Sequence, residues 1–298
     1  MNPEPTLPQA PRRPFYWSVR RELWENRAVW MAPTLVAGLV FFATLINLTG
    51  LPKKLESYPT LGAAEQHLLV VRPFSLAPAP IMLVAFLSGL FYAFDALYSE
   101  RRDRSVLFWK SLPVSDLTTV LAKASLPIVV LPALACALSW AVFAALLLAG
   151  TLILSVSGMS PAPLWVELPF VQSPVVMIYG LVVHSLWFAP IYAWVLLVSA
   201  WARRLPVLWV VLPPLALAAF EHVLGGSRLA SFLRDRVSGA MQEAFALRPG
   251  SDDAGLIDQL AQLSPLRFLS SPGLWAGLAF AAGCLVLAAR LRRRRDPT

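Results

Sequence analysis

Few side chains in this sequence could do chemistry, and they are widely separated. The histidines are His67, His184 and His222, and none belongs to an HExxH or GxSxG motif. A hydrolase needs a nucleophile with a base in reach, which these surroundings do not supply. The cysteines, Cys136 and Cys284, lie in apolar runs without a CxxC or Cys/His cluster, so neither a disulfide framework nor a zinc site is supported. We therefore predict no catalytic, cofactor-binding or metal-binding residue, and no enzyme activity in this chain.

Four ionisable side chains stand inside or beside long apolar runs, where a charge is costly. They are Asp95, His184, Glu221 and His222. Each could line a translocation path or form a gate. Each also has a structural interpretation: Asp95 could pair with the Arg203-Arg204 pair or a helix terminus, His184 could bond to a neighbouring helix, and Glu221 and His222 could anchor the chain at the membrane interface.

The composition indicates that these residues are positioned by membrane-spanning helices. Of the 298 residues, 57% are hydrophobic and only 14% are charged, against about 25% charged in soluble domains. Uncharged runs of 18 or more residues recur, and each is long enough to cross a bilayer. A soluble fold is excluded, and we predict an all-α polytopic membrane protein. The net charge of +8 does not indicate nucleic acid, because the basic residues lie between apolar runs.

Six spans are predicted within a single domain, 1–298. The third apolar interval is longer than one crossing requires, so we place one span in it, with a kink at Pro127 and Pro132, and treat residues 158–166 as an external or re-entrant segment. The spans lie in or near residues 28–52, 73–94, 128–156, 175–198, 205–220 and 268–289.

The positive-inside rule orients these spans. Six crossings put both termini on one side, and with that side cytoplasmic, 17 of the 25 basic residues lie inside and eight outside. Two crossings in the third interval would instead place Arg292, Arg293, Arg294 and Arg295 outside. We therefore predict a multi-pass protein with both termini in the cytoplasm.

The N-terminal region contains two different segments. Residues 1–14 are rich in proline and predict a disordered cytoplasmic tail. Residues 15–27 predict an interfacial amphipathic helix whose charged residues lie on a different face from its aromatic ones; a simple aromatic and basic flank to the first span is the alternative. The candidate residues of this interfacial helix are Tyr16, Trp17, Arg20, Leu23 and Trp24.

Residues 225–271, between the fifth and sixth spans, predict external amphipathic helices. Apolar residues recur every four positions from Leu229 through Leu233, Val237 and Met241 to Phe245, which is the spacing of one helix face. A second, shorter helix is expected at 254–263. Both would lie on or dip into the outer leaflet.

The most informative segment is 99–115, between the second and third spans. Mixed charges precede an apolar group, and Pro113 followed by Ser115 or Asp116 ends the segment and can cap the next helix. The pattern predicts a short cytoplasmic helix with an apolar ridge that a soluble partner could bind, although a basic loop resting on lipid headgroups would share this composition. The candidate coupling residues are Glu100, Arg101, Arg102, Asp103, Ser105, Val106, Leu107, Phe108, Trp109 and Lys110.

The string from Glu100 to Ser115, followed by a third span that carries Lys123, resembles the signature of permease subunits of type 2 ATP-binding-cassette (ABC) exporters. The interfacial helix and the external 225–271 segment are also similar to that family's architecture. Two positions depart from its pattern: Arg104-Ser105 replaces a frequent glycine-threonine pair, and Trp109 replaces a small aliphatic residue.

This resemblance implies a permease in the bacterial inner membrane. It would work as a dimer with a second copy or a paralogue, and two cytoplasmic ABC ATPase subunits would bind through the coupling helix. The ATP and Mg would then be bound by the partner, since the chain has no Gly-Lys dipeptide and so lacks a GxxxxGK[ST] loop.

Two other functions share these sequence features. An ion-coupled secondary transporter or channel would use Asp95, His184 and Glu221, although paired acidic residues at the midplane would be expected. A membrane anchor could instead recruit a soluble complex through the same cytoplasmic ridge. The low number of buried charges is compatible with lipids, hydrophobic drugs, peptides or lipid-linked glycans as cargo.

Overall fold

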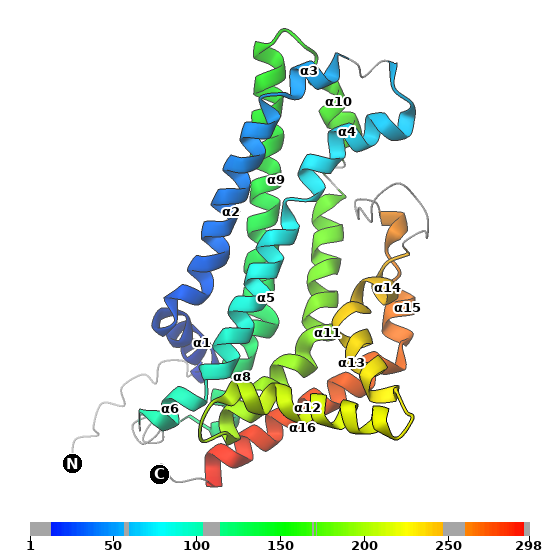
Figure 1. The fold of residues 1–298 in the computed structure, drawn as a ribbon. Helices are drawn as coiled ribbons and strands as arrows, with labels where there is room; N and C mark the ends of the chain where they lie inside the picture. The colour runs from blue at the N-terminus through cyan, green and yellow to red at the C-terminus, as the bar shows by residue number, and fades with distance from the viewer. Residues whose placement is uncertain are drawn as a thin grey trace, which may run out of the picture.

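The computed structural model describes residues 13–56, 60–103, 114–168, 170, 172–246 and 260–294. In this part of the chain six helices are long and apolar enough to cross a membrane, and the secondary structure is almost entirely helical (Figure 1). The prediction of an all-α polytopic membrane protein is confirmed at this level.

Three upright helices form one side of the molecule. They are α2 (Arg27–Leu48), α5 (Pro78–Asp95) and α9 (Leu131–Val156), and each contacts the other two. Fully buried residues such as Ile81 and Leu146 fill the space between them. A fourth long helix, α11 (Ser173–Trp201), packs against α5 and α9 and contains Pro190 in its middle.

The third span is one continuous helical run, as predicted. It begins with α8 (Asp116–Ser125), passes through a π-helical turn, η2 (Leu126–Val130), and continues as α9. Proline has no amide hydrogen and disturbs the regular helical hydrogen bonds, and Pro127 lies inside the π turn, which locates the expected irregularity. Gly89 of α5 packs directly against Pro127, where a Cβ would lie 3.0 Å from the proline ring.

Short helices cover the end of the bundle that is remote from α1 (Pro14–Glu25). They are α3 (Leu51–Leu55), α4 (Ala63–Ser75) and α10 (Ala162–Glu167) (Figure 1). The segment expected to be external or re-entrant thus contains α10, whose Leu164 is buried. His67 Nδ1 lies 3.0 Å from Glu167 Oε2 and links α4 to α10.

The C-terminal third is arranged differently from the upright helices. The helix α16 (Pro272–Arg294) lies along α11, while α12 (Pro206–Val223) runs across the lower end of the bundle in Figure 1 and buries little besides Pro206. Between them lie α13 (Arg228–Ser238), α14 (Ala240–Ala244), the 3-10 turn η3 (Leu260–Gln262) and α15 (Pro265–Ser270).

The external segment departs from the single first helix that its four-residue repeat predicts. The run breaks at Gly239, between α13 and α14. Phe245, at the end of the repeat, packs with Trp187 of α11 and Phe268 of α15 instead of continuing the helix. Most of the second expected helix, 254–263, lies outside the described residues.

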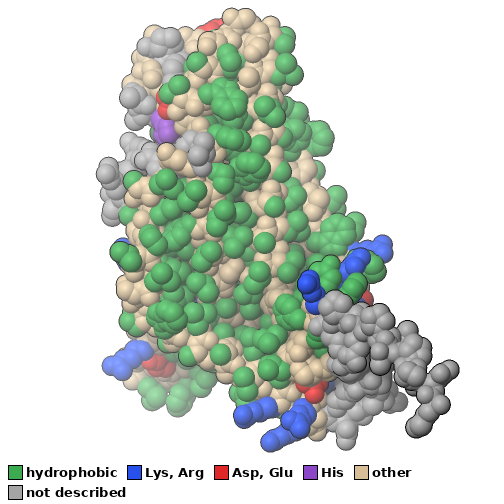
Figure 2. All heavy atoms as spheres, turned by 180° about the vertical axis from the view of Figure 1, so that it is seen from behind, with side chains coloured by type: hydrophobic (Ala, Val, Ile, Leu, Met, Phe, Trp, Pro, Cys, Tyr) green, Lys and Arg blue, Asp and Glu red, His purple; other side chains and the backbone are tan. Residues whose placement is uncertain are grey.

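The surface of the upright helices is apolar. Figure 2 shows hydrophobic side chains over most of this face, with many Lys and Arg side chains toward its lower end. Along α2, Leu35, Leu39 and Ile46 are each more than 60% exposed. Such a surface suits contact with lipid.

Candidate functional site

A buried network of charged side chains joins four elements at the lower end of the bundle. Glu22 comes from α1, Glu100 from α6 (Tyr98–Arg102), Lys123 from α8 and Arg292 from α16. Their exposed fractions are 1%, 7%, 3% and 8%. Charged residues are rarely buried to this degree unless they are paired. We therefore take these four residues and their partners as the candidate site.

Lys123 lies at the centre of the network. Its Nζ is 2.9 Å from Glu22 Oε1 and 3.1 Å from Glu100 Oε1. Tyr92 of α5 donates its hydroxyl hydrogen to Glu22 Oε2 at 2.8 Å, and Arg21 Nη2 donates to Glu22 Oε1 at 2.7 Å. Burial by itself would raise the pKa of Glu22, but Lys123, Arg21 and Tyr92 outweigh it and hold that pKa below its usual value.

Arg292 extends the network to the end of the described chain. Its Nη1 donates to Glu100 Oε2, and its Nε donates to Asp116 Oδ1 at 3.0 Å. The carboxylates of Glu22, Glu100 and Asp116 thus face three cations, Lys123, Arg292 and Arg21, and the formal charges of these six side chains cancel. Removing one member would leave a buried charge uncompensated, which is strongly destabilising.

The residue types at the start of α8 explain how Lys123 reaches this position. Ser115 is the N-cap, and its Oγ accepts a hydrogen bond from the Thr118 amide at 3.1 Å, as the sequence predicts for Ser115 or Asp116. Asp116 follows in the first turn, where a negative charge is favoured. Lys123 then lies about two turns further along, facing α1 and α6.

The orientation of α1 determines where its charged residues point. Glu22 faces the bundle and is buried, whereas Tyr16, Trp17 and Trp24 are more than half exposed and Leu23 packs partly against buried residues. Arg20 lies over the rings of Trp17 and Trp24, 5.2 and 4.7 Å from their centroids. The charged stripe therefore meets its partners inside the bundle while the aromatic stripe faces outward.

The corner between α5 and α6 is fixed to the end of α11. Arg101 Nη2 donates to the carbonyl oxygens of Ser199 and Ala202 at 2.6 and 2.8 Å. In return, Ser199 Oγ accepts hydrogen bonds from the amides of Leu97 and Tyr98. Two predicted coupling residues, Glu100 and Arg101, thus point into the protein and anchor the segment that follows them.

The rest of the predicted coupling residues divide into two groups. Arg102 and Asp103 are exposed and paired with each other, with 3.0 Å between Arg102 Nε and Asp103 Oδ1. The apolar ridge and its flanks, Ser105, Val106, Leu107, Phe108, Trp109 and Lys110, lie outside the described residues.

A polar hollow of about 310 Å³ lies beside the network. Glu25, Asp95, Ser99 and Asp103 line it together with Glu22, Tyr92, Glu100 and Lys123. Burial raises the pKa of Glu25 against the lowering effect of Arg21. Among the described residues no group of three or more His, Cys, Asp or Glu side chains is placed to hold a metal ion.

The four candidate pathway or gate residues do not converge. Asp95 lies at the hollow and has no ion pair with Arg203 or Arg204 in the described part of the chain. His184 packs its ring against Phe86 and Phe188 within α5 and α11. Their positions give no shared site for an ion or a substrate.

Glu221, at the end of α12, has a structural role in the next helix. Its two carboxylate oxygens accept hydrogen bonds from the amides of Arg228 and Leu229, at 3.0 and 2.6 Å. These amides begin α13, where helix N–H groups have no partners within the helix. The neighbouring His222 is exposed.

A buried cation outside this network, Arg236, was not predicted. Arg236 of α13 is 6% exposed, and its guanidinium carbon lies 4.6 Å from the centroid of the Trp187 ring. Its Nη1 donates to the Gly273 carbonyl at 3.3 Å, and its own carbonyl accepts from Trp187 Nε1 at 2.8 Å. Arg236 thereby joins α13 to α11 and α16, in a segment whose sequence predicted only an amphipathic surface helix.

Comparison with protein-family models, with curated proteins and with solved structures finds no match for this chain.

Proposed function

We propose that this chain is the membrane-spanning permease subunit of an ABC exporter of the type 2 class. The observation that carries the proposal is the charge network at the base of the connection between the second and third spans. Glu100 precedes this connection and Asp116 follows it, and both bind Arg292 of α16. A force applied to the connection would therefore act on α1, α8 and α16 together.

The proposed mechanism is a rigid-body movement driven by a partner. ATP binding and hydrolysis in two cytoplasmic ATPase subunits would displace the segment containing Val106 to Trp109, and the network would transmit this displacement to the spans. Bundle rocking of this kind is a common way to alternate access in transporters. In this proposal the chain holds no ATP or Mg itself, and a second copy or a paralogue completes the translocation pathway.

The proposed orientation places the network at the cytoplasmic face of the bacterial inner membrane. The arginine-rich end of α16 and the basic residues of α1 meet at this end of the bundle, as the positive-inside rule requires of cytoplasmic segments. Six crossings with both termini in the cytoplasm are part of this proposal.

Two arginines on one helix provide a test. Arg292 is buried in the network, whereas Arg290, two residues away on α16, is exposed and has no side-chain partner among the described residues. The tagged chain should be purified from its native membrane, the bound proteins identified, and ATP hydrolysis measured with wild type, Arg292→Gln and Arg290→Gln in proteoliposomes. We expect an ATPase to copurify with all three.

We further expect the wild-type chain to raise the rate of ATP hydrolysis by the partner. In Arg292→Gln this stimulation should be roughly tenfold smaller, and in Arg290→Gln it should equal that of wild type. If no nucleotide-binding protein copurifies, or if both variants behave as wild type, the proposal is wrong.

The acidic hollow favours one other candidate, an ion-coupled transporter. Five carboxylates that line this hollow beside Lys123 could bind and release cations without any ATPase. Proteoliposomes containing the chain alone distinguish the two, because ion-coupled transport requires flux that follows an imposed ion gradient in the absence of nucleotide.

A further inference from the structure

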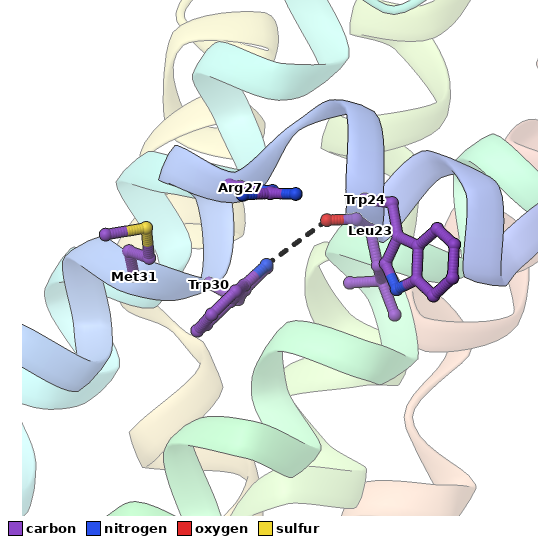
Figure 3. Close-up of a pocket in the computed structure, with 5 residues that line it drawn as sticks. All are labelled: Leu23, Trp24, Arg27, Trp30 and Met31. Carbon is purple, nitrogen blue, oxygen red and sulfur yellow. Dashed lines mark hydrogen bonds between the residues drawn. The ribbon is translucent and has the colours of Figure 1, made fainter.

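An apolar hollow lies at the corner between α1 and α2. Its walls are formed by Leu23, Trp24, Trp30 and Met31, and its volume is about 360 Å³. Among the described residues that line it, Arg27 is the one with a charge. Figure 3 shows Arg27 and Trp30 extending from the start of α2 beside Leu23. Trp30 Nε1 donates to the Leu23 carbonyl at 3.2 Å, so the indole offers the hollow mainly its apolar ring.

Arg27 has no acidic partner in the described part of the chain. It is exposed and makes no side-chain hydrogen bond or ion pair with the described residues. The nearby carboxylates are engaged elsewhere, since Glu22 is buried against Lys123 and Glu25 lies 3.6 Å from Arg21. An anion that approached Arg27 would meet no competing carboxylate from these residues.

The surroundings indicate what kind of anion fits. Arg20 lies between the rings of Trp17 and Trp24 on the same side of α1, so tryptophan and arginine alternate along this stripe from Trp17 to Arg27. Tryptophan is enriched at membrane interfaces, and basic groups there attract anionic lipid. Leu35, about one turn beyond Met31 on α2, is also exposed.

We infer that this hollow binds one anionic phospholipid. The phosphate would accept charge-assisted hydrogen bonds from Arg27, with Arg20 adding attraction, and an acyl chain would lie against Trp30 and Met31. A free phosphate or a soluble anion would gain nothing from the apolar walls. This inference depends on membrane insertion and not on the proposed transport function.

Native mass spectrometry of the full chain in detergent tests the inference. The probes are phosphatidylglycerol and phosphatidylcholine with identical acyl chains, added to wild type, Arg27→Gln and Arg290→Gln. Arg27 is exposed and unpaired among the described residues, so its substitution should leave the fold intact. Arg290→Gln removes the same charge from an exposed site outside the hollow.

We expect wild type to retain one phosphatidylglycerol in preference to phosphatidylcholine. Arg27→Gln should weaken this binding about tenfold, which corresponds to about 1.4 kcal/mol, while Arg290→Gln binds as wild type. The inference is overturned if wild type does not discriminate between the two lipids, if both variants lose binding equally, or if millimolar glycerol 3-phosphate displaces the lipid.

Discussion

Replacing Lys123 with methionine would remove the central cation of the buried network. Methionine approximates the length of the lysine side chain, so the change tests charge more than packing. The substitution leaves Glu22 and Glu100, which now lie 2.9 and 3.1 Å from Lys123 Nζ, without this partner. Breaking a buried ion pair by removing one member costs about 3–5 kcal/mol.

The measurable consequence is a lower unfolding temperature. At this chain length 1 kcal/mol corresponds to roughly 2 °C, so Lys123→Met should unfold roughly 6–10 °C below wild type. Intrinsic fluorescence during heating in a fixed detergent measures the transition. Lys53→Met is the matched control, because Lys53 is exposed on α3 and has no side-chain partner among the described residues; it should shift the temperature by about 1 °C or less.

A double substitution separates pairing from packing. If the unpaired Glu22 carboxylate destabilises the folded Lys123→Met protein, then adding Glu22→Gln should restore part of the lost unfolding temperature, because the uncompensated charge is gone. Equal shifts for Lys123→Met and Lys53→Met would refute the assignment of the network as a structural joint. So would fully additive losses in the double variant.

Two further predictions concern acid and close packing. The pKa of Glu22 is lowered in the folded state. The Glu22 carboxylate therefore contributes its full stability above about pH 4.3, and this contribution is lost as the pH falls through the folded pKa. When the unfolding temperature is measured against pH, Lys123→Met should show a smaller decrease than wild type over this acidic range. Gly277→Ala should destabilise the protein by about 1–3 kcal/mol, since a methyl group would overlap Arg236 Nη2 and lie 3.0 Å from Pro190 Cγ, whereas Gly283→Ala on the same helix meets no atom within 4 Å and should be neutral or stabilising in a thermal unfolding assay.

The apolar helices could be predicted from sequence because their signal is local. Long uncharged runs and helix-breaking residues lie next to each other in the chain, so the single third span, its irregular turn at Pro127 and the Ser115 cap were predictable. The break at Gly239 was not, because a regular four-residue repeat continues across it. Phe245, at the end of this repeat, is buried in one cluster with Trp187 and Phe268, and no local pattern contains those contacts.

The charge network could not be predicted because it depends on pairing between distant residues. In a soluble protein the charged face of an amphipathic helix faces water. Beside a membrane the aromatic stripe has lipid to contact, which leaves the charged stripe free to turn inward toward Lys123 and Glu100. The sequence feature that could have indicated the network is a glutamate on an interfacial helix combined with a lysine near the start of an apolar span. Many pairs of surface residues would also fit this description.

A neutral buried network is a costly way to hold four helices together. Well-packed apolar residues would often be as stable or more so, and the upright helices α2, α5 and α9 are held in that way. Charged contacts differ because one carboxylate can pair with more than one cation: Glu100 lies 3.8 Å from Arg21 as well as beside Lys123 and Arg292. Glu22, Glu100 and Lys123 also line the adjoining polar hollow. Under the proposed function, in which an ATPase moves the connection between the second and third spans, a joint of this kind could change its pairing, whereas an apolar contact could not.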